Sequence, residues 1–70
     1  MAKWIVDAMP ISGRSSATVT ERKFFLTDNA AKAYVRDAAK MRLAVRVRSA
    51  PDVKPSIRME HGEAIRWAHS

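Results

Sequence analysis

The alternation of apolar and polar residues is strictest over 42–48, where the chain reads Arg-Leu-Ala-Val-Arg-Val-Arg. The apolar residues of one parity are Leu43, Val45 and Val47. The arginines of the other parity are Arg42, Arg46 and Arg48. A period of two is typical of a strand with one buried face and one face in water. The pattern therefore predicts a strand over 43–49 whose exposed face carries guanidinium groups.

Two more strands are predicted nearer the N-terminus. Residues 4–9 form a β-favouring run that Pro10 ends, and residues 17–26 return to β-favouring composition. The turn-rich segment 11–16 joins them as a long-looped hairpin. Parity in the second strand is mixed around Phe24 and Phe25, which indicates a bulge or a segment covered on both faces.

A helix of about 15 residues is predicted to begin after Thr27 or Asp28. Either side chain can cap free amides, and an acid suits the positive end of the helix dipole. Residues spaced i, i+3, i+4 and i+7 form an apolar stripe of Ala31, Tyr34, Val35, Ala38 and Met41. The polar stripe opposite consists of Asn29, Lys32, Arg36 and Lys40.

The C-terminal third is predicted to be a polar loop over 50–55, held extended by prolines, and then a hairpin turning at Glu60-His61-Gly62. A two-residue turn would mix apolar and basic side chains on each face. A three-residue loop with Gly62 in the left-handed conformation keeps them apart. Burial selects the three-residue loop, because a slip of one residue inverts every side chain. The apolar face then holds Ile57, Ile65 and Trp67, and the other face holds Arg58 and Arg66.

These elements predict a single α+β domain over 1–70 with the order β-β-α-β-β-β. We expect two layers, an antiparallel sheet of four to five strands with one helix across it. The helix should cover the face that bears Leu43, Val45, Val47, Ile57, Ile65 and Trp67. The uncovered face should carry four arginines, Arg46, Arg48, Arg58 and Arg66.

Composition narrows the options for stability and partners. The 70 residues include no cysteine, which excludes disulfides and thiolate metal sites, so a dense core, a homodimer or a partner must stabilise the domain. Lys and Arg total 13 against 7 acids, a formal charge of +6. Such an excess predicts attraction to nucleic acid, acidic protein surfaces or anionic lipid. No apolar run approaches a membrane span or a signal peptide, so we expect a cytoplasmic protein without membrane association.

Catalytic and metal-binding patterns are weak throughout. Ser15 and Ser16 have no nearby histidine, and the carboxylates of Glu60 and Glu63 flank a hairpin tip. His61, Glu63 and His69 match no standard zinc spacing. We therefore expect neither an enzyme, nor a metal site, nor a cofactor.

The arginine face has two interpretations. It is either a solvated surface with acids interleaved or a binding site for an anionic partner. The aromatic residues fall mostly in core parity, and of these Trp67, close to the terminus, is the first candidate to lie outside the core. A basic face without stacking residues favours phosphate or acidic protein over base recognition. The outer stripe of the helix, with Lys32, Arg36 and Lys40, offers further phosphate contacts.

The order of elements resembles that of small phage-encoded anti-CRISPR proteins that inhibit type I systems. The shared features are the strand pair before the helix, the Ala31-Lys32 helix start, the basic-apolar alternation after it, and a turn Gly62 followed by Arg66-Trp67. This resemblance implies a non-enzymatic inhibitor that docks on a guide-RNA surveillance complex and competes with DNA. It also implies that Lys32, Arg36 and Arg66 contact the backbone subunits of that complex.

The function expected from these observations is a phage or mobile-element protein that inhibits a host nucleic-acid-handling complex, in the host cytoplasm, by docking through its basic surface. The alternative is a DNA- or RNA-binding accessory protein that contacts phosphates without sequence specificity. A structural role in a homo-oligomer is the third option. The expected partner-binding residues are Lys32, Arg36, Lys40, Arg46, Arg48, Arg58 and Arg66.

Overall fold

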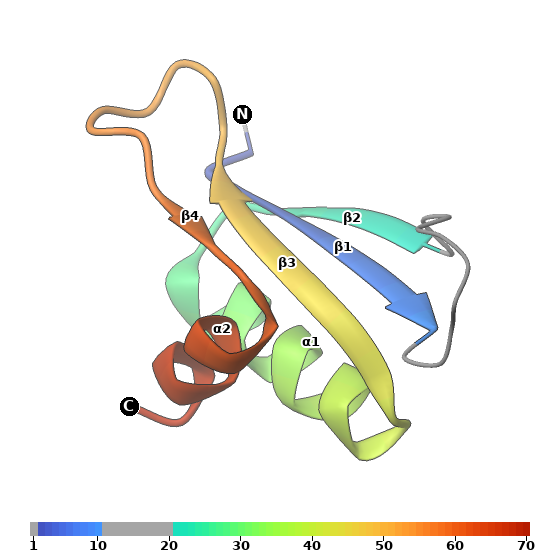
Figure 1. The fold of residues 1–70 in the computed structure, drawn as a ribbon. Helices are drawn as coiled ribbons and strands as arrows, with labels where there is room; N and C mark the ends of the chain where they lie inside the picture. The colour runs from blue at the N-terminus through green and yellow to red at the C-terminus, as the bar shows by residue number, and fades with distance from the viewer. Residues whose placement is uncertain (1, 11–20) are drawn as a thin grey trace.

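The computed structural model describes residues 2–10 and 21–70 as a four-stranded antiparallel sheet packed against two helices. The elements are β1 (Trp4–Pro10), β2 (Glu21–Phe25), α1 (Asp28–Lys40), β3 (Leu43–Ser49), β4 (Arg58–Met59) and α2 (His61–Ala68). The strands lie in the order β2-β1-β3-β4, and both helices cover the same face (Figure 1). The two-layer α+β class with an antiparallel sheet is therefore confirmed. The expected turn over 11–16 and the first part of the second strand, 17–20, lie outside the described residues.

The central pair of strands, β1 and β3, confirms the predicted alternation. Val45 and Val47 are buried in the core that lies between the sheet and the helices. Arg46 and Arg48 take the other parity and face away from the helices. Arg42 does not belong to this strand, because its φ of 62° places it in a left-handed turn between α1 and β3.

Helix α1 begins as its sequence predicts. The Thr27 hydroxyl accepts a hydrogen bond from the Ala30 amide at 3.2 Å, which caps the helix. The buried positions are Ala31, Val35 and Ala38. The helix ends at Lys40 after 13 residues, so Met41 lies beyond the apolar stripe and is 70% exposed.

The predicted final hairpin is wrong: residues 61–68 form the helix α2, and the order of elements is β-β-α-β-β-α. Ala64 and Ala68, four residues apart, are both buried against the core. In a helix this spacing places both alanines on one face. In a strand the charged Arg66 would lie between them on the same side. Gly62 lies in the first turn of the helix without a positive φ. The helical period of the small residues therefore determines this segment.

Helix α2 contacts both α1 and the sheet. The Arg36 guanidinium donates a hydrogen bond to the Ala68 carbonyl at 2.8 Å. The rings of Trp4 and Trp67 lie 5.0 Å apart between centroids. Ile65 and Trp67 thus pack against the core from a helix and not from the sheet, while Ile57 remains 38% exposed.

Candidate functional site

Strand register determines which side chains share the open face of the sheet. Asp7 of β1 lies opposite Arg22 of β2 and Arg46 of β3. Directly opposed residues point to the same side of an antiparallel sheet. These three residues therefore form one row across the open face. A parallel row runs from Phe24 through Ile5 and Arg48 to Arg58.

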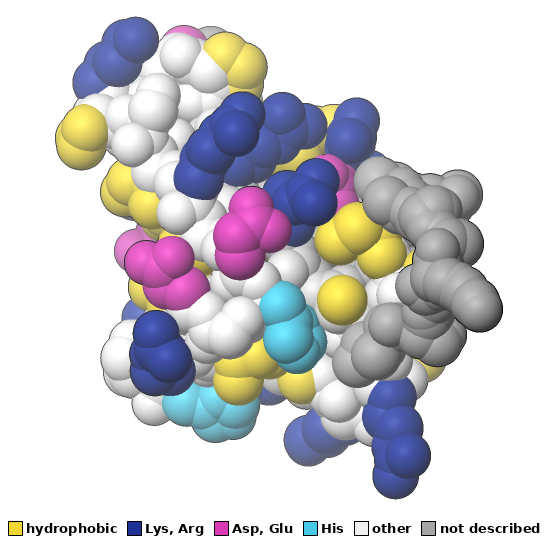
Figure 2. Space-filling view, in the orientation of Figure 1, with side chains coloured by type: hydrophobic (Ala, Val, Ile, Leu, Met, Phe, Trp, Pro, Cys, Tyr) yellow, Lys and Arg dark blue, Asp and Glu magenta, His cyan; other side chains and the backbone are white. Residues whose placement is uncertain are grey.

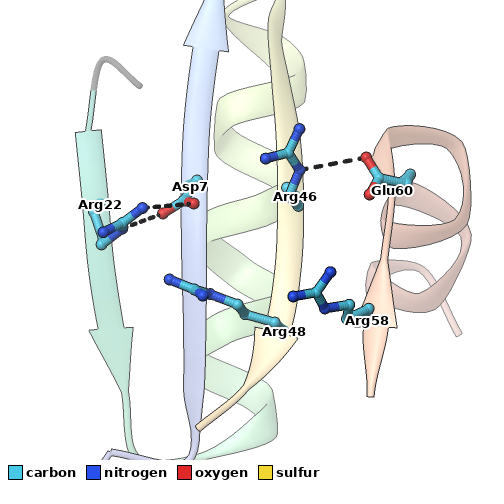
Figure 3. A pocket seen from close by; sticks show the side chains of 6 residues that line it. All are labelled: Asp7, Arg22, Arg46, Arg48, Arg58 and Glu60. Carbon is cyan, nitrogen blue, oxygen red and sulfur yellow. Dashed lines mark hydrogen bonds and ion pairs between the residues drawn. The ribbon is translucent and has the colours of Figure 1, made fainter. Parts of the chain in front are cut away.

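The two rows enclose a shallow pocket of about 170 Å³ on the open face. Its lining consists of Asp7, Arg22, Arg46, Arg48, Arg58 and Glu60, which Figure 3 shows from close by. All four strands and the residue before α2 contribute to it. Basic and acidic side chains gather in the middle of the face shown in Figure 2. Four arginines against two acids leave this arginine pocket with a net charge of +2.

The most buried charge in the arginine pocket is Asp7, which is 4% exposed. Arg22 donates two hydrogen bonds to its carboxylate, from Nε to Oδ1 at 2.7 Å and from Nη2 to Oδ2 at 3.2 Å. This bidentate geometry is the strong form of an arginine–carboxylate pair. The hydrogen bond and the charge of Asp7 raise the pKa of Arg22 above its ordinary value. Asp7 and Arg22 thus neutralise each other, and the buried Asp7 forms the floor of the pocket.

A second, weaker ion pair lies at the rim of the arginine pocket. Arg46 Nε is 3.4 Å from Glu60 Oε1, and both side chains are largely exposed. Exposed pairs of this kind contribute little to stability. An anionic ligand can therefore compete with Glu60 for Arg46 at small cost.

Among the residues that the structure describes, Arg48 and Arg58 carry positive charge without a carboxylate partner. The two residues lie directly opposite each other on β3 and β4, and neither belongs to an ion pair within the described residues. Arg48 Nε is buried and lacks a hydrogen-bond partner in the described structure. The Arg48 side chain extends across β1, and that of Arg58 extends toward β3, into the same hollow (Figure 3). This pair has unused capacity to bind an anion.

The predicted partner-binding residues divide between two sides of the molecule. Arg46, Arg48 and Arg58 come together in the arginine pocket, as expected. Arg66 lies on α2 and does not, because the segment that carries it is a helix.

The basic residues of α1 also lie in the helix layer, on the side of the sheet opposite the pocket. Arg36 binds the end of α2, and Lys32 Nζ lies 5.4 Å from the centre of the Trp67 ring. Lys40 is exposed in the last turn of α1. At least two of these three residues thus have contacts that stabilise the packing of the two helices.

Three residues of the open face could not be assigned to a site from the sequence. Asp7 stands out only as an acid in the apolar run 4–9, at the parity opposite to Trp4 and Val6. Arg22 and Phe24 depend on the register between β1 and β2, and no local pattern fixes that register. The single acid in an otherwise apolar strand is the local signal that marks this face.

The aromatic residues confirm the core assignment with one correction. Trp4 is buried, and Phe25 and Tyr34 pack against the core with ring centroids 5.4 Å apart. Phe24 was also expected in the core, but it is 60% exposed. It lies on the open face because its neighbour Phe25 takes the helix side. An aromatic side chain therefore accompanies the arginines after all.

Other polar contacts belong to the helix side of the sheet. The Trp4 indole donates to Asp28 Oδ1 at 2.6 Å, and this bond is the main cause of a lowered pKa of Asp28. The Tyr34 hydroxyl donates to Glu21 at 2.8 Å and lowers the pKa of that carboxyl. Burial, together with this bond, raises the pKa of Tyr34 to about 12. These groups fix α1 to the first two strands.

Residues 2–10 and 21–70 contain neither a metal-binding cluster nor a membrane-spanning helix. No group of three or more histidine, cysteine or acidic side chains in these ranges could hold a metal ion. Neither helix of these ranges is long and apolar enough to span a bilayer. Comparison with protein-family models, with curated proteins and with solved structures finds no match for the chain. The arginine pocket is therefore the candidate functional site of the described residues.

Proposed function

We propose that this protein is a non-enzymatic binding module that holds the phosphate backbone of a nucleic acid on the open face of its sheet. The observation that carries the proposal is the cross-strand pair of Arg48 and Arg58, whose charges have no carboxylate partner among the described residues. Like charges directly opposite each other destabilise a sheet. A bound phosphate offsets that cost, because guanidinium groups hold it by two parallel hydrogen bonds.

The floor of the arginine pocket supports phosphate over a metal-bound or neutral ligand. Asp7 already has Arg22 as its partner, so its charge does not oppose an anion in the hollow. Three guanidinium groups, those of Arg46, Arg48 and Arg58, remain to face the ligand. The formal charge of +6 on the whole chain adds long-range attraction for a polyanion.

The test is a charge reversal with a matched control. The variant Arg48→Glu/Arg58→Glu changes the charge on the open face, and Lys40→Glu/Arg66→Glu changes the net charge equally from the helix layer. Binding of a fluorescent oligonucleotide is measured at several salt concentrations. We expect the open-face variant to lose affinity by about 10-fold or more and its salt slope to fall by about 1.4, the share of two phosphate contacts to a single strand.

Two results would contradict this proposal. One is an equal loss of affinity in both double variants, which would mean that net charge alone attracts the ligand. The other is a folded wild-type protein that does not bind nucleic acid even at low salt. Circular dichroism spectra of each variant establish that the fold is retained before binding is compared.

A second candidate function uses the same surface with a protein partner. Phe24 and Leu26 are exposed at 60% and 65%, at the end of β2 beside the basic face. Aromatic anchors next to arginines are typical of protein interfaces. In this case the protein is an inhibitor that docks on a host nucleic-acid-handling complex. Affinity capture from a bacterial lysate treated with nuclease tests it: a stoichiometric complex that Arg48→Glu/Arg58→Glu loses supports the inhibitor, and its retention by that variant refutes it.

A further inference from the structure

We infer that the nucleic acid held on the open face is single-stranded, with one base stacked on Phe24 while its neighbouring phosphate lies in the arginine pocket. This inference rests on the proposed function and specifies the form of the ligand. It depends on an observation that the pocket itself does not include: the exposed ring of Phe24 lies in the same row as two arginines that have no acidic partner among the described residues.

The position of Phe24 follows from the register. Ile5 of β1 lies opposite Phe24 on one side and opposite Arg48 on the other. Two strand spacings, about 10 Å, therefore separate the backbone beneath the ring from the backbone that carries Arg48. The Arg48 side chain reaches back across β1 toward β2 and shortens that gap (Figure 3). A ring and a guanidinium thus flank a central residue on the same face.

The residue between them is covered, so the ring of Phe24 is the exposed apolar surface of this row. Ile5 is 8% exposed although its face of the sheet lacks a helix. Phe24 is instead 60% exposed and sits on β2, at the edge of the sheet, where its ring has access to solvent. A large aromatic side chain in water beside a basic site is a suitable platform for a base.

The choice between a single strand and a duplex depends on whether the face of a base is free to stack on Phe24. In a duplex the faces of the bases are already stacked on each other, so a surface ring gains nothing from them. In a single strand each base has a free face, and proteins that bind single strands combine a basic groove with aromatic stacking. A duplex would use the arginines alone. Phe24 therefore distinguishes the two ligands, whereas Arg48 and Arg58 do not.

The experiment compares oligo-dT, oligo-rU and a mixed-sequence duplex, all of about 20 nucleotides, at one salt concentration. The variants are Phe24→Ala, Phe24→Trp and the control Met41→Ala, whose side chain is exposed at the far end of α1. We expect Phe24→Ala to weaken binding of both single strands by about 5-fold or more and to change duplex binding by less than about 2-fold. Phe24→Trp should restore single-strand affinity, and Met41→Ala should leave every affinity unchanged.

The outcomes separate this inference from the proposed function. The inference is refuted if Phe24→Ala weakens binding of single strands and duplex equally, or changes neither. If Arg48→Glu/Arg58→Glu abolishes binding in the same experiment, the proposed function still stands. If the wild-type protein binds no oligonucleotide but binds polyglutamate, both are refuted and the open face recognises an acidic protein. Failure of Phe24→Trp to restore binding would show that the ring does not act by stacking.

Discussion

The substitution Arg58→Glu tests whether the arginine pair is retained at a cost to the fold. Arg58 and Arg48 are directly opposed on β4 and β3, so wild-type protein places two positive charges side by side. Glutamate at position 58 converts this pair into an opposite-charge pair. Arg48 has no acidic partner among the described residues, so the new carboxylate gives it a neighbour of opposite charge. We therefore expect the variant to be more stable than the wild type.

The size of this gain follows from the value of cross-strand pairs. Opposite charges on a sheet face contribute roughly 0.2–1 kcal/mol, and like charges cost a similar amount. Because Arg58 is exposed, screening reduces both effects, and we expect a total gain of about 1 kcal/mol. For a domain of this size, about 1 kcal/mol corresponds to a rise in Tm of about 4–8 °C. The neutral variant Arg58→Gln should show about half of the gain, since it removes repulsion without adding a partner.

Thermal unfolding followed by circular dichroism gives the order of the three Tm values, with oligonucleotide affinity measured on the same samples. We expect the Tm to be highest for Arg58→Glu, intermediate for Arg58→Gln and lowest for the wild type. The affinity for the oligonucleotide should follow the reverse order. High salt should compress the differences in Tm. A Tm that falls in Arg58→Glu, in a protein that remains folded, would refute the idea that Arg48 and Arg58 repel each other.

Two further substitutions test other parts of the fold. Gly62→Ala should raise the free energy of unfolding by about 0.5 kcal/mol in urea titrations. The added Cβ meets nothing within 4 Å, and alanine favours the helical conformation of α2. A loss of stability would instead indicate that Gly62 takes the left-handed conformation of a hairpin turn. Tyr34 has its pKa raised to about 12 from an ordinary value of 10.0, so its contribution to stability is intact below pH 10 and is lost as pH rises toward 12. The free energy of unfolding of Tyr34→Phe should therefore fall less between about pH 10 and pH 12 than that of the wild type. An identical pH profile in both proteins would contradict the proposed environment of the phenol.

The parts of the fold that the sequence predicts correctly are those determined by local pattern. The period-two alternation places Val45 and Val47 in the core, and the cap at Thr27 sets the start of α1. The same alternation brings Arg46 and Arg48 to the open face. Two of the six residues that line the pocket follow from this alternation, because it needs only neighbouring residues.

The final element shows why the rest was not predictable in the same way. The segment 61–68 contains both a period-two pair, Ile65 and Trp67, and a period-four pair, Ala64 and Ala68. Large apolar residues favoured the strand interpretation. The structure follows the small residues, because α2 must pack closely against the core, where Ala64 and Ala68 are both buried. The placement of Arg66 changed with it.

The remaining residues of the site depend on long-range pairing. Arg22 reaches Asp7, and Phe24 reaches the row of Arg48, only through the β1–β2 register. No local pattern in β2 sets that register, and a shift of one residue would exchange the two faces of β2. The ion pair at the floor of the pocket and its adjacent aromatic therefore required the three-dimensional structure.

The central claim is that an anionic strand binds the open face of the sheet, and the arginine side chains report on this directly. Two-dimensional ¹H–¹⁵N spectra resolve the Nε–Hε groups of arginine, which can be followed while oligo-dT is added. We predict that the signals of Arg48 and Arg58 shift progressively while those of Arg36 and Arg66, in the helix layer, stay in place. Shifts confined to Arg36 and Arg66, with Arg48 and Arg58 unmoved, would contradict the account.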